Sequence, residues 1–291
     1  MSETNCVISL TNFNDIETIY NSIRNMNRLS INMESCFYIS LDEMIKYYLE
    51  NYFILSKISI NNSLEFCGFA LYFTEYNRNI GWGVYVDDLF VAESYRRKGM
   101  CRLQMKNIAK LCKANNLKFI KLIYQNLNVH HFEIYKKFGF KNTGLQLLEI
   151  FGKENIVKFK NLVLDANLCQ NNSKMSFEKS KKVINTGEVW SITILNDNSY
   201  HFDMQTSYNC WLGPIMFLNN FSGNLVDIES KDIWIALNYF LKENMEIFGM
   251  WADIDNENLE ILLKEIGFTN ITKNEFWTSL ILDENGIENL L

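Results

Sequence analysis

The order in which strand-like and helical runs follow one another over residues 7–149 constrains the fold more than any other feature. Apolar residues at helical spacing alternate there with runs rich in β-branched and aromatic residues. The expected strands are 7–10, 52–60, 65–75, 83–91, 118–124 and 143–149, and the expected helices are 14–27, 41–49, 100–115 and 130–138. This order predicts an α+β or mixed α/β structure in which helices pack on one curved, mostly antiparallel sheet.

The chain has 291 residues, which is enough for two domains that each bury a core. A polar segment rich in Lys, Asn and Ser spans 168–186, after a helical run at 153–167. We therefore expect one domain at 1–167, a linker region at 168–186 and a second domain at 187–291. In the second domain the expected strands are 189–195, 200–205, 211–218, 248–253 and 275–282, and the expected helices are 231–243 and 258–266.

Composition excludes several classes of function. The seven cysteines are scattered without a CxxC pair, and the three histidines form no metal-binding pattern, which predicts reduced thiols, no metal site and a cytoplasmic protein. No apolar run approaches the roughly 18 residues of a membrane helix, and no secretory signal is expected at the N-terminus.

Charge is distributed unevenly along the chain. The net charge is −6, but residues 92–141 contain 12 Lys and Arg against Glu93 and Glu133. A basic region on an acidic protein favours one polyanionic ligand over a nucleic-acid surface. The alternative is a pair of solvated, lysine-rich helix faces.

Two segments carry candidate chemistry. The first, 86–102, reads as a strand, a basic turn with Gly99 and a helix, and the backbone N–H groups of such a turn suit a pyrophosphate. The second, 126–140, places Asn128 and Tyr135 seven residues apart, ahead of Gly139 and Phe140. A tyrosine there can protonate a leaving thiolate and the asparagine can hold a ligand amide. The alternative is a core tyrosine and a helix-capping asparagine.

Together the two segments resemble the GNAT acetyltransferase superfamily. The family pattern Arg/Gln-x-x-Gly-x-Gly/Ala matches Arg96, Gly99 and, imperfectly, Cys101, and the later Asn, aliphatic-Tyr and Gly-Phe pattern matches the second segment. The resemblance covers about residues 7–149. It implies acetyl-CoA as co-substrate, Tyr135 as general acid, and direct attack of an amine on the thioester without an acyl-enzyme. The implied acetyl-CoA contacts are Leu89, Phe90, Val91, Arg96, Arg97, Lys98, Gly99, Met100, Cys101, Arg102, Asn128 and His131.

Two residues depart from the family pattern. Cys101 stands where Gly or Ala lets the backbone approach the phosphates, so weakened affinity is expected. His131 stands where Ala is usual, close to the implied CoA arm, and it can either crowd or contact the ligand.

Within the superfamily the likeness is to diamine (spermidine/spermine) acetyltransferases, in segments 68–73 and 85–91. That group has an acidic residue at the place of Asp87, which holds the cationic amine. Strand alternation predicts that Asp87 and Leu89 face the same side, near the acyl group. The alternative is that Asp87 and Asp88 cap a strand bulge or bind backbone amides. Glu75 and Asp87 are the candidates for substrate binding and for the general base.

The C-terminal half repeats the second pattern without its chemistry. Asn256 lies eleven residues before Gly267-Phe268, but Leu263 takes the tyrosine position. The preceding segment 218–230 has no basic turn and contains Asp227 and Glu229, so a degenerate GNAT-like domain is expected.

The sequence therefore predicts an acetyl-CoA-dependent N-acetyltransferase for a primary amine, such as a diamine or polyamine. A protein or peptide N-terminus as acceptor, or an acyl-CoA-binding sensor with little turnover, are the alternatives. We expect no nucleic-acid, membrane or metal partner, and the oligomeric state stays open between monomer and homodimer.

Overall fold

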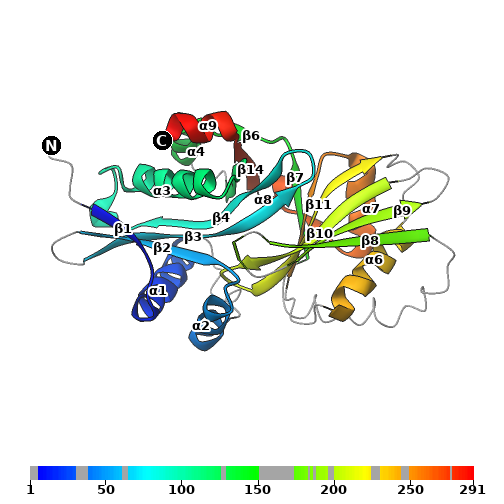
Figure 1. Cartoon of the computed structure of the whole chain (residues 1–291), viewed down its shortest axis with the longest axis horizontal. Coiled ribbons are helices and arrows are strands. Elements are labelled where there is room, and N and C mark those ends of the chain that lie inside the picture. The colour runs from blue at the N-terminus through cyan, green and yellow to red at the C-terminus, as the bar shows by residue number, and fades with distance from the viewer. Residues whose placement is uncertain are drawn as a thin grey trace.

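The computed structural model describes residues 6–30, 39–60, 65–125, 129–150, 174–182, 184–185, 188–195, 200–223, 230–243, 249–275 and 277–291. Two seven-stranded sheets follow one another along the long axis of the molecule (Figure 1). No helix of these described ranges is both long and apolar enough to span a bilayer.

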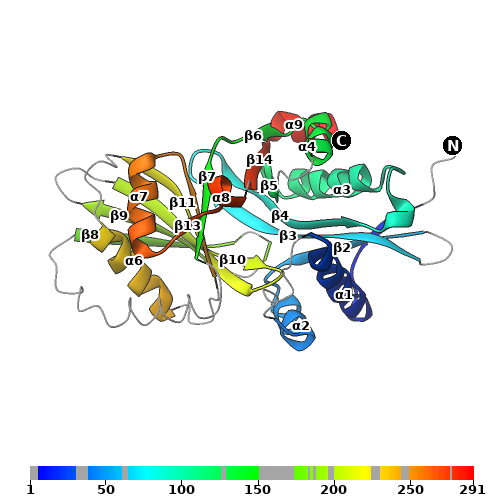
Figure 2. The ribbon, with the colours of Figure 1, turned by 180° about the vertical axis from the view of Figure 1, so that it is seen from behind.

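The first sheet is covered by helices on both faces. Its strand order is β1 (Cys6–Leu10), β2 (Ile54–Ile60), β3 (Phe66–Asn77), β4 (Gly81–Val91), β5 (Ile120–Gln125), β14 (Trp277–Leu282) and β6 (Lys141–Asn142). Among the described strands of this sheet, β4 and β5 are the only parallel pair. α1 (Phe13–Ser30) and α2 (Leu41–Leu49) lie on one face, and α3 (Met100–Ala114), α4 (Val129–Lys137) and α9 (Glu284–Leu290) lie on the other (Figures 1 and 2). Nearly all of β3 is buried, as expected for a central strand covered on both faces.

The second sheet repeats this order. Its strands are β8 (Lys174–Lys181), β9 (Glu188–Leu195), β10 (Tyr200–Asn209), β11 (Gly213–Gly223), β12 (Gly249–Ile254), β7 (Gln146–Ile150) and β13 (Thr269–Asn270). Again one pair, β11 and β12, is parallel. Among the described residues, the α-helices of this unit are α6 (Ser230–Glu243), α7 (Glu257–Ile266) and α8 (Ile271–Glu275). The matching order shows two similar mixed α/β units in tandem.

The two units exchange one strand. β14, from the C-terminal end of the chain, lies between β5 and β6 of the first sheet. β7, which the sequence places as the last strand of the first domain, lies between β12 and β13 of the second sheet. The expected linker 168–186 is not a simple linker, because it contains β8. The domain boundary at 168–186 stays a proposal. Each sheet contains one strand from the other side of that boundary.

Local signals explain the elements that the sequence predicted well. α2 begins with a capping box, in which the Ser40 hydroxyl accepts from the Glu43 N–H at 3.2 Å and the Ser40 N–H donates to the Glu43 carboxylate at 2.7 Å. α3 begins after Gly99 and ends near Asn115, as its apolar spacing predicts. The helix expected at 153–167 lies outside the described residues.

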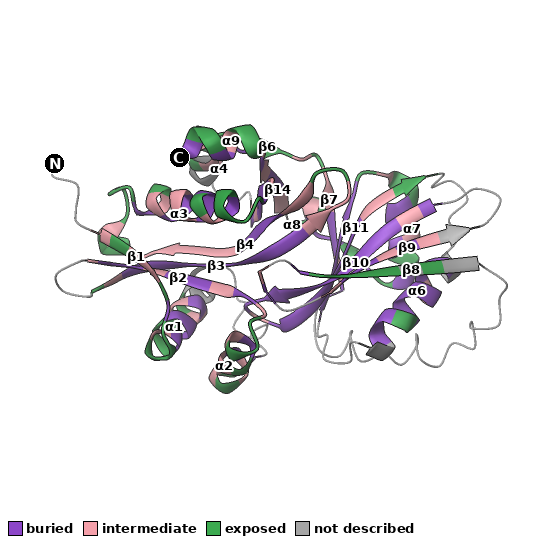
Figure 3. Ribbon diagram, viewed as in Figure 1, coloured by how far each residue is buried: buried purple, intermediate pink, exposed green. Residues whose placement is uncertain are grey.

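The units share a core. One cluster of buried side chains combines residues of α1, α2, β2, β3 and β4 with residues of β10, β11 and β12. Figure 3 shows the buried surface running from the first sheet into the second. We call this side of the first sheet the shared face, and the side that carries α3 the α3 face.

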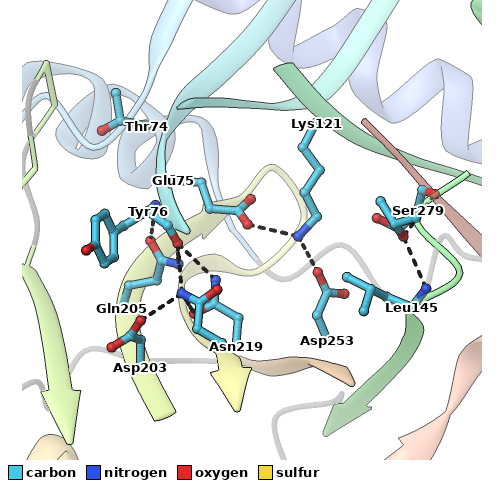
Figure 4. Close-up of polar contacts among 12 residues, drawn as sticks. Thr74, Glu75, Tyr76, Lys121, Leu145, Asp203, Gln205, Asn219, Asp253 and Ser279 are labelled. Atoms are coloured by element: carbon cyan, nitrogen blue, oxygen red, sulfur yellow. Dashed lines mark hydrogen bonds and ion pairs between the residues drawn. The ribbon is translucent and has the colours of Figure 1, made fainter. Parts of the chain in front are cut away.

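A buried ion cluster also joins the units. Lys121 on β5 donates to Glu75 on β3 at 2.8 Å and to Asp253 on β12 (Figure 4). All three side chains are at least 95% buried. The two carboxylates raise the pKa of Lys121 and more than offset burial, which acts in the opposite direction.

Candidate active site

The basic turn leads into the start of α3. Gly99 is the N-cap with φ +84°, a left-handed conformation that glycine adopts without strain, and no atom lies within 4 Å of where its Cβ would be. Arg96, Arg97, Lys98 and Arg102 are exposed, and the first turn of α3 has no acidic residue. An open backbone, a helix N-terminus and four cations together fit a phosphate group.

The first two residues of α3, Met100 and Cys101, are less exposed than the turn before them. Met100 is buried and packs with Ile58 and Cys67. Cys101 is half-buried, and burial raises the pKa of its thiol to about 11. The thiol is therefore neutral at physiological pH, and it adds no charge to the phosphate-binding turn.

β4 and β5 pair over only a short stretch. Their pairing ends at Val86 and Leu122, although β4 runs on to Val91 and β5 to Gln125. Over these described residues the backbone of Leu89, Phe90 and Val91 is therefore not paired with β5. Leu89 packs on the α3 face and Phe90 packs on the shared face, with its ring 5.6 Å from that of Phe69.

A β-bulge stands where the two strands part. Leu71 pairs with Asp88 and the next residue, Tyr72, pairs with Val86, so Asp87 is the extra residue. The Asp87 carboxylate accepts from the Cys210 N–H at 2.9 Å, on the shared face. The prediction that Asp87 and Leu89 share a side was wrong, because the bulge shifts the alternation by one residue. Instead, Asp87 turns away from Leu89.

The bulge gathers three ionisable groups. The ligand atoms of Asp87, Asp88 and Cys210 all lie within 4.8 Å of one another. Burial raises the pKa of Asp88 to about 6, and burial together with the charge of Asp88 raises that of Asp87 well above its ordinary value. Burial and the two carboxylates raise the pKa of Cys210 as well, so its thiol keeps its proton.

Tyr135 lies on the α3 face. It is half-buried on α4, with its ring 6.2 Å from Tyr124 and 5.7 Å from Phe140. Burial, and to a lesser degree Cys101, raises its pKa, so the phenol is a neutral proton donor at physiological pH. Asn128 lies outside the described residues, as does the side chain of His131.

Glu75 is not at an open site. Only 2% of it is exposed, and it is paired with Lys121 in the ion cluster of Figure 4. The sequence predicted Glu75 and Asp87 together as candidates for amine binding. The structure instead groups Asp87 with Asp88 and Cys210. No local pattern points to Cys210, because it comes from the other half of the chain.

The second unit matches the first only in its framework. Asn256 caps α7 by accepting from the N–H groups of Asn258 and Leu259, and Gly267 ends that helix at φ +110°, as Gly139 follows α4 at φ +93°. Leu263, at the place of Tyr135, is fully buried in the core of the second sheet. Residues Asp227 and Glu229 lie outside the described residues.

One protein family and several solved structures are similar to this chain. Residues 19–140 match the model of the Acetyltransferase (GNAT) family. No curated protein sequence matches the chain. One similar solved structure is a tandem GNAT protein from the clavulanic acid biosynthesis pathway, with 8% identity over 96% of this chain and 98% of that one, at a TM-score of 0.48.

Two further structures match about half of the chain. Ard1 from Thermoplasma volcanium is 20% identical over 48% of this chain and 86% of its own, at a TM-score of 0.37. A mutant spermidine N-acetyltransferase from Vibrio cholerae is 19% identical over 49% and 83%, at a TM-score of 0.40.

The structure has two similar mixed α/β units in tandem, and both sequence motifs lie in the first unit. The match covers residues 19–140 and both motifs lie inside that range, so the first unit contains an acetyltransferase domain of the GNAT family.

Proposed function

We propose that the chain transfers the acetyl group of acetyl-CoA to a small primary amine. The observation that carries this proposal is the position of Asp87 and Asp88 at the bulge where β4 leaves β5. Two carboxylates at that point suit the cationic amine of a diamine or polyamine, because an ammonium group beside them is both attracted and oriented.

The donor side uses the α3 face. The basic turn, Arg96 to Arg102, binds the pyrophosphate, and the backbone of Leu89, Phe90 and Val91 pairs with the pantetheine arm. The resemblance to the family also implies contacts of Asn128 and His131 with this arm. The space around Gly99 is open where a Cβ would lie, so the backbone of the turn is accessible to the phosphates there.

The reaction is a direct attack in a ternary complex. The amine, once it has lost a proton, attacks the thioester carbon, and the C–S bond breaks as the new C–N bond forms. Tyr135 gives its proton to the leaving thiolate. Asp88 is suited to accept the amine proton, directly or through water, because its pKa of about 6 lies close to the working pH.

An acceptor panel tests the proposal. Release of free thiol from acetyl-CoA would be measured with diamines, polyamines, amino acids, aminoglycosides and peptides. We expect turnover with the diamines or polyamines. Asp88→Asn should raise the amine KM while acetyl-CoA binding stays intact, and the exposed Asp255 supplies the charge-matched control Asp255→Asn. Turnover with peptides alone would overturn the small-amine assignment, and binding of acetyl-CoA without turnover would overturn the enzymatic one.

A further inference from the structure

The turn between β10 and β11 places one residue of the second unit at the bulge of β4. Cys210, 2% exposed, sits in this turn and donates its N–H to Asp87. The turn is itself held by Asn209, whose side-chain oxygen accepts from the N–H groups of Trp211 and Leu212 at 3.0 and 3.1 Å. Gly213 completes it with φ +87° and packs so closely on α2 that a Cβ would lie 3.0 Å from the Tyr47 ring. Cys210 is therefore fixed relative to the first unit.

The carboxylates of Asp87 and Asp88 beside Cys210 have no positively charged partner among the described residues. Among the described residues, no Lys or Arg forms an ion pair with Asp87 or Asp88, and Asp88 Oδ2 is buried without a hydrogen-bond partner. The hydroxyls of Tyr85 and Tyr208 are also buried, and neither has a hydrogen-bond partner among the described residues. Both phenols lie near enough to the two carboxylates for the carboxylate charges to raise their pKa values, although burial is the larger cause.

In the ion cluster of Lys121, a pair of buried carboxylates is neutralised by a lysine of the chain itself. Glu75 and Asp253 are buried about as deeply as Cys210, and Lys121 between them supplies the positive charge. At the bulge the corresponding position holds a neutral thiol instead of an ammonium. Two adjacent carboxylates with a neutral thiol beside them leave a place for a positive charge from outside the chain.

We propose that Cys210, supplied by the second unit, is a positioning residue of the acceptor site, where it holds Asp87 and Asp88 apart so that both accept from one primary ammonium group. This inference rests on the proposed function. The backbone N–H fixes Asp87, and the neutral S–H donates to a carboxylate oxygen. The remaining carboxylate oxygens then face the N–H groups of the ammonium. The second unit thereby takes part in acceptor binding without a donor site of its own.

The test uses the full chain and the diamine or polyamine with the highest turnover in the panel. Cys210→Ala removes the S–H donor, and we expect it to raise the amine KM about tenfold, as loss of a hydrogen bond to a charged group does. The acetyl-CoA affinity measured by calorimetry should stay unchanged. Cys210→Ser keeps a donor and should keep the amine KM within about threefold. Cys112→Ala is the matched control, because that thiol is equally buried but packs in the core of the α3 face.

A double-mutant cycle separates positioning from general structural support. In an Asp88→Asn background, Cys210→Ala should add much less to the amine KM, because the carboxylate that it positions has lost its charge. Fully additive effects would overturn the proposal. If Cys210→Ala does not fold, Cys210→Ser decides the matter: a tenfold rise in its amine KM with intact acetyl-CoA binding also overturns it.

Three other results have distinct meanings. If the wild-type chain acetylates amines and Cys210→Ala does so with an unchanged KM, the role of Cys210 is refuted while the proposed function stands. Stoichiometric Zn²⁺ bound by the wild-type chain and lost in Cys210→Ala would overturn the proposal too, since a metal at this cluster needs the thiolate and would occupy the place of the ammonium. No turnover with any amine would refute the proposed function itself.

Discussion

Tyr135 and Asp88 both hold their protons more tightly than usual, and burial is the first cause in each case. The consequences differ because their ordinary pKa values differ. Tyr135 stays neutral throughout the physiological range and remains a donor. Asp88, with a pKa of about 6, changes charge within that range. In the proposed mechanism, Tyr135 on the α3 face protonates the thiolate and Asp88 at the bulge accepts the amine proton.

Tyr135→Phe tests the donor. We expect turnover to fall about 100-fold or more, because the phenylalanine ring keeps the packing against Tyr124 and Phe140 but has no proton to give. Acetyl-CoA affinity should change little. Steady-state kinetics and calorimetry on the same preparation make the comparison, and unchanged turnover across the pH range would remove Tyr135 from the mechanism.

The charge of Asp88 predicts a pH dependence of acceptor binding. Below about pH 6 the carboxyl is protonated and attracts an ammonium group weakly, whereas above it the carboxylate is charged. The amine KM should therefore fall as the pH rises from 5 to 7.5, while the amine itself stays protonated. Asp88→Asn should flatten this dependence. A KM that is constant over the range in the wild-type chain would contradict the assignment.

At the scale of elements, local pattern predicted most helices and strands of the first unit. The expected helix 41–49 coincides with α2, and the expected helix 100–115 differs from α3 by one residue. Periodicity and caps are properties of neighbouring residues, so one sequence contains them. The alternation in 143–149 shows that a strand is buried, but it does not say in which sheet, and β7 lies in the second one.

The residues of the candidate site also fall into those that a local pattern predicts and those that only the fold brings together. The basic turn and Tyr135 belong to continuous motifs, so the sequence alone could propose them. The bulge at Asp87 was weighed only as an alternative, because simple alternation assumes an unbroken ladder. Cys210 was missed because it reaches Asp87 across 123 positions of the chain.

Leu280 tests the exchanged strand β14. This side chain is fully buried, and its residue pairs with Leu122 on β5. Leu280→Ala should lower the free energy of unfolding by about 2–5 kcal/mol, as removal of a buried leucine side chain does. Amide exchange should accelerate first in β5 and β6, in the first sheet, although the substitution is in the C-terminal segment. Leu291→Ala, at a partly exposed position beyond α9, is the control, and equal exchange in both sheets would contradict the prediction.

At the scale of the whole molecule, three features tie the two units together. Each sheet contains a strand from the other half, one apolar cluster includes side chains of both, and Lys121 bridges Glu75 and Asp253 between β3, β5 and β12. The hairpin of β3 and β4 adds contacts, since the Tyr76 carbonyl accepts from Gln205 and Asn219 (Figure 4). The second unit is thus part of the structural support of the first.

These ties predict that the chain unfolds as one cooperative unit. Neither sheet can keep its sixth strand once the other half has unfolded, so urea unfolding followed by circular dichroism and by tryptophan fluorescence should give coincident transitions. Lys121→Met should shift both curves together, by about 3–5 kcal/mol, because it leaves two buried carboxylates without their cation. Lys113→Met is the control: its pair with Glu288 is exposed, so its effect should stay under about 1 kcal/mol. Two separate transitions, or a shift of one curve alone after Lys121→Met, would show that the units fold independently despite the exchanged strands.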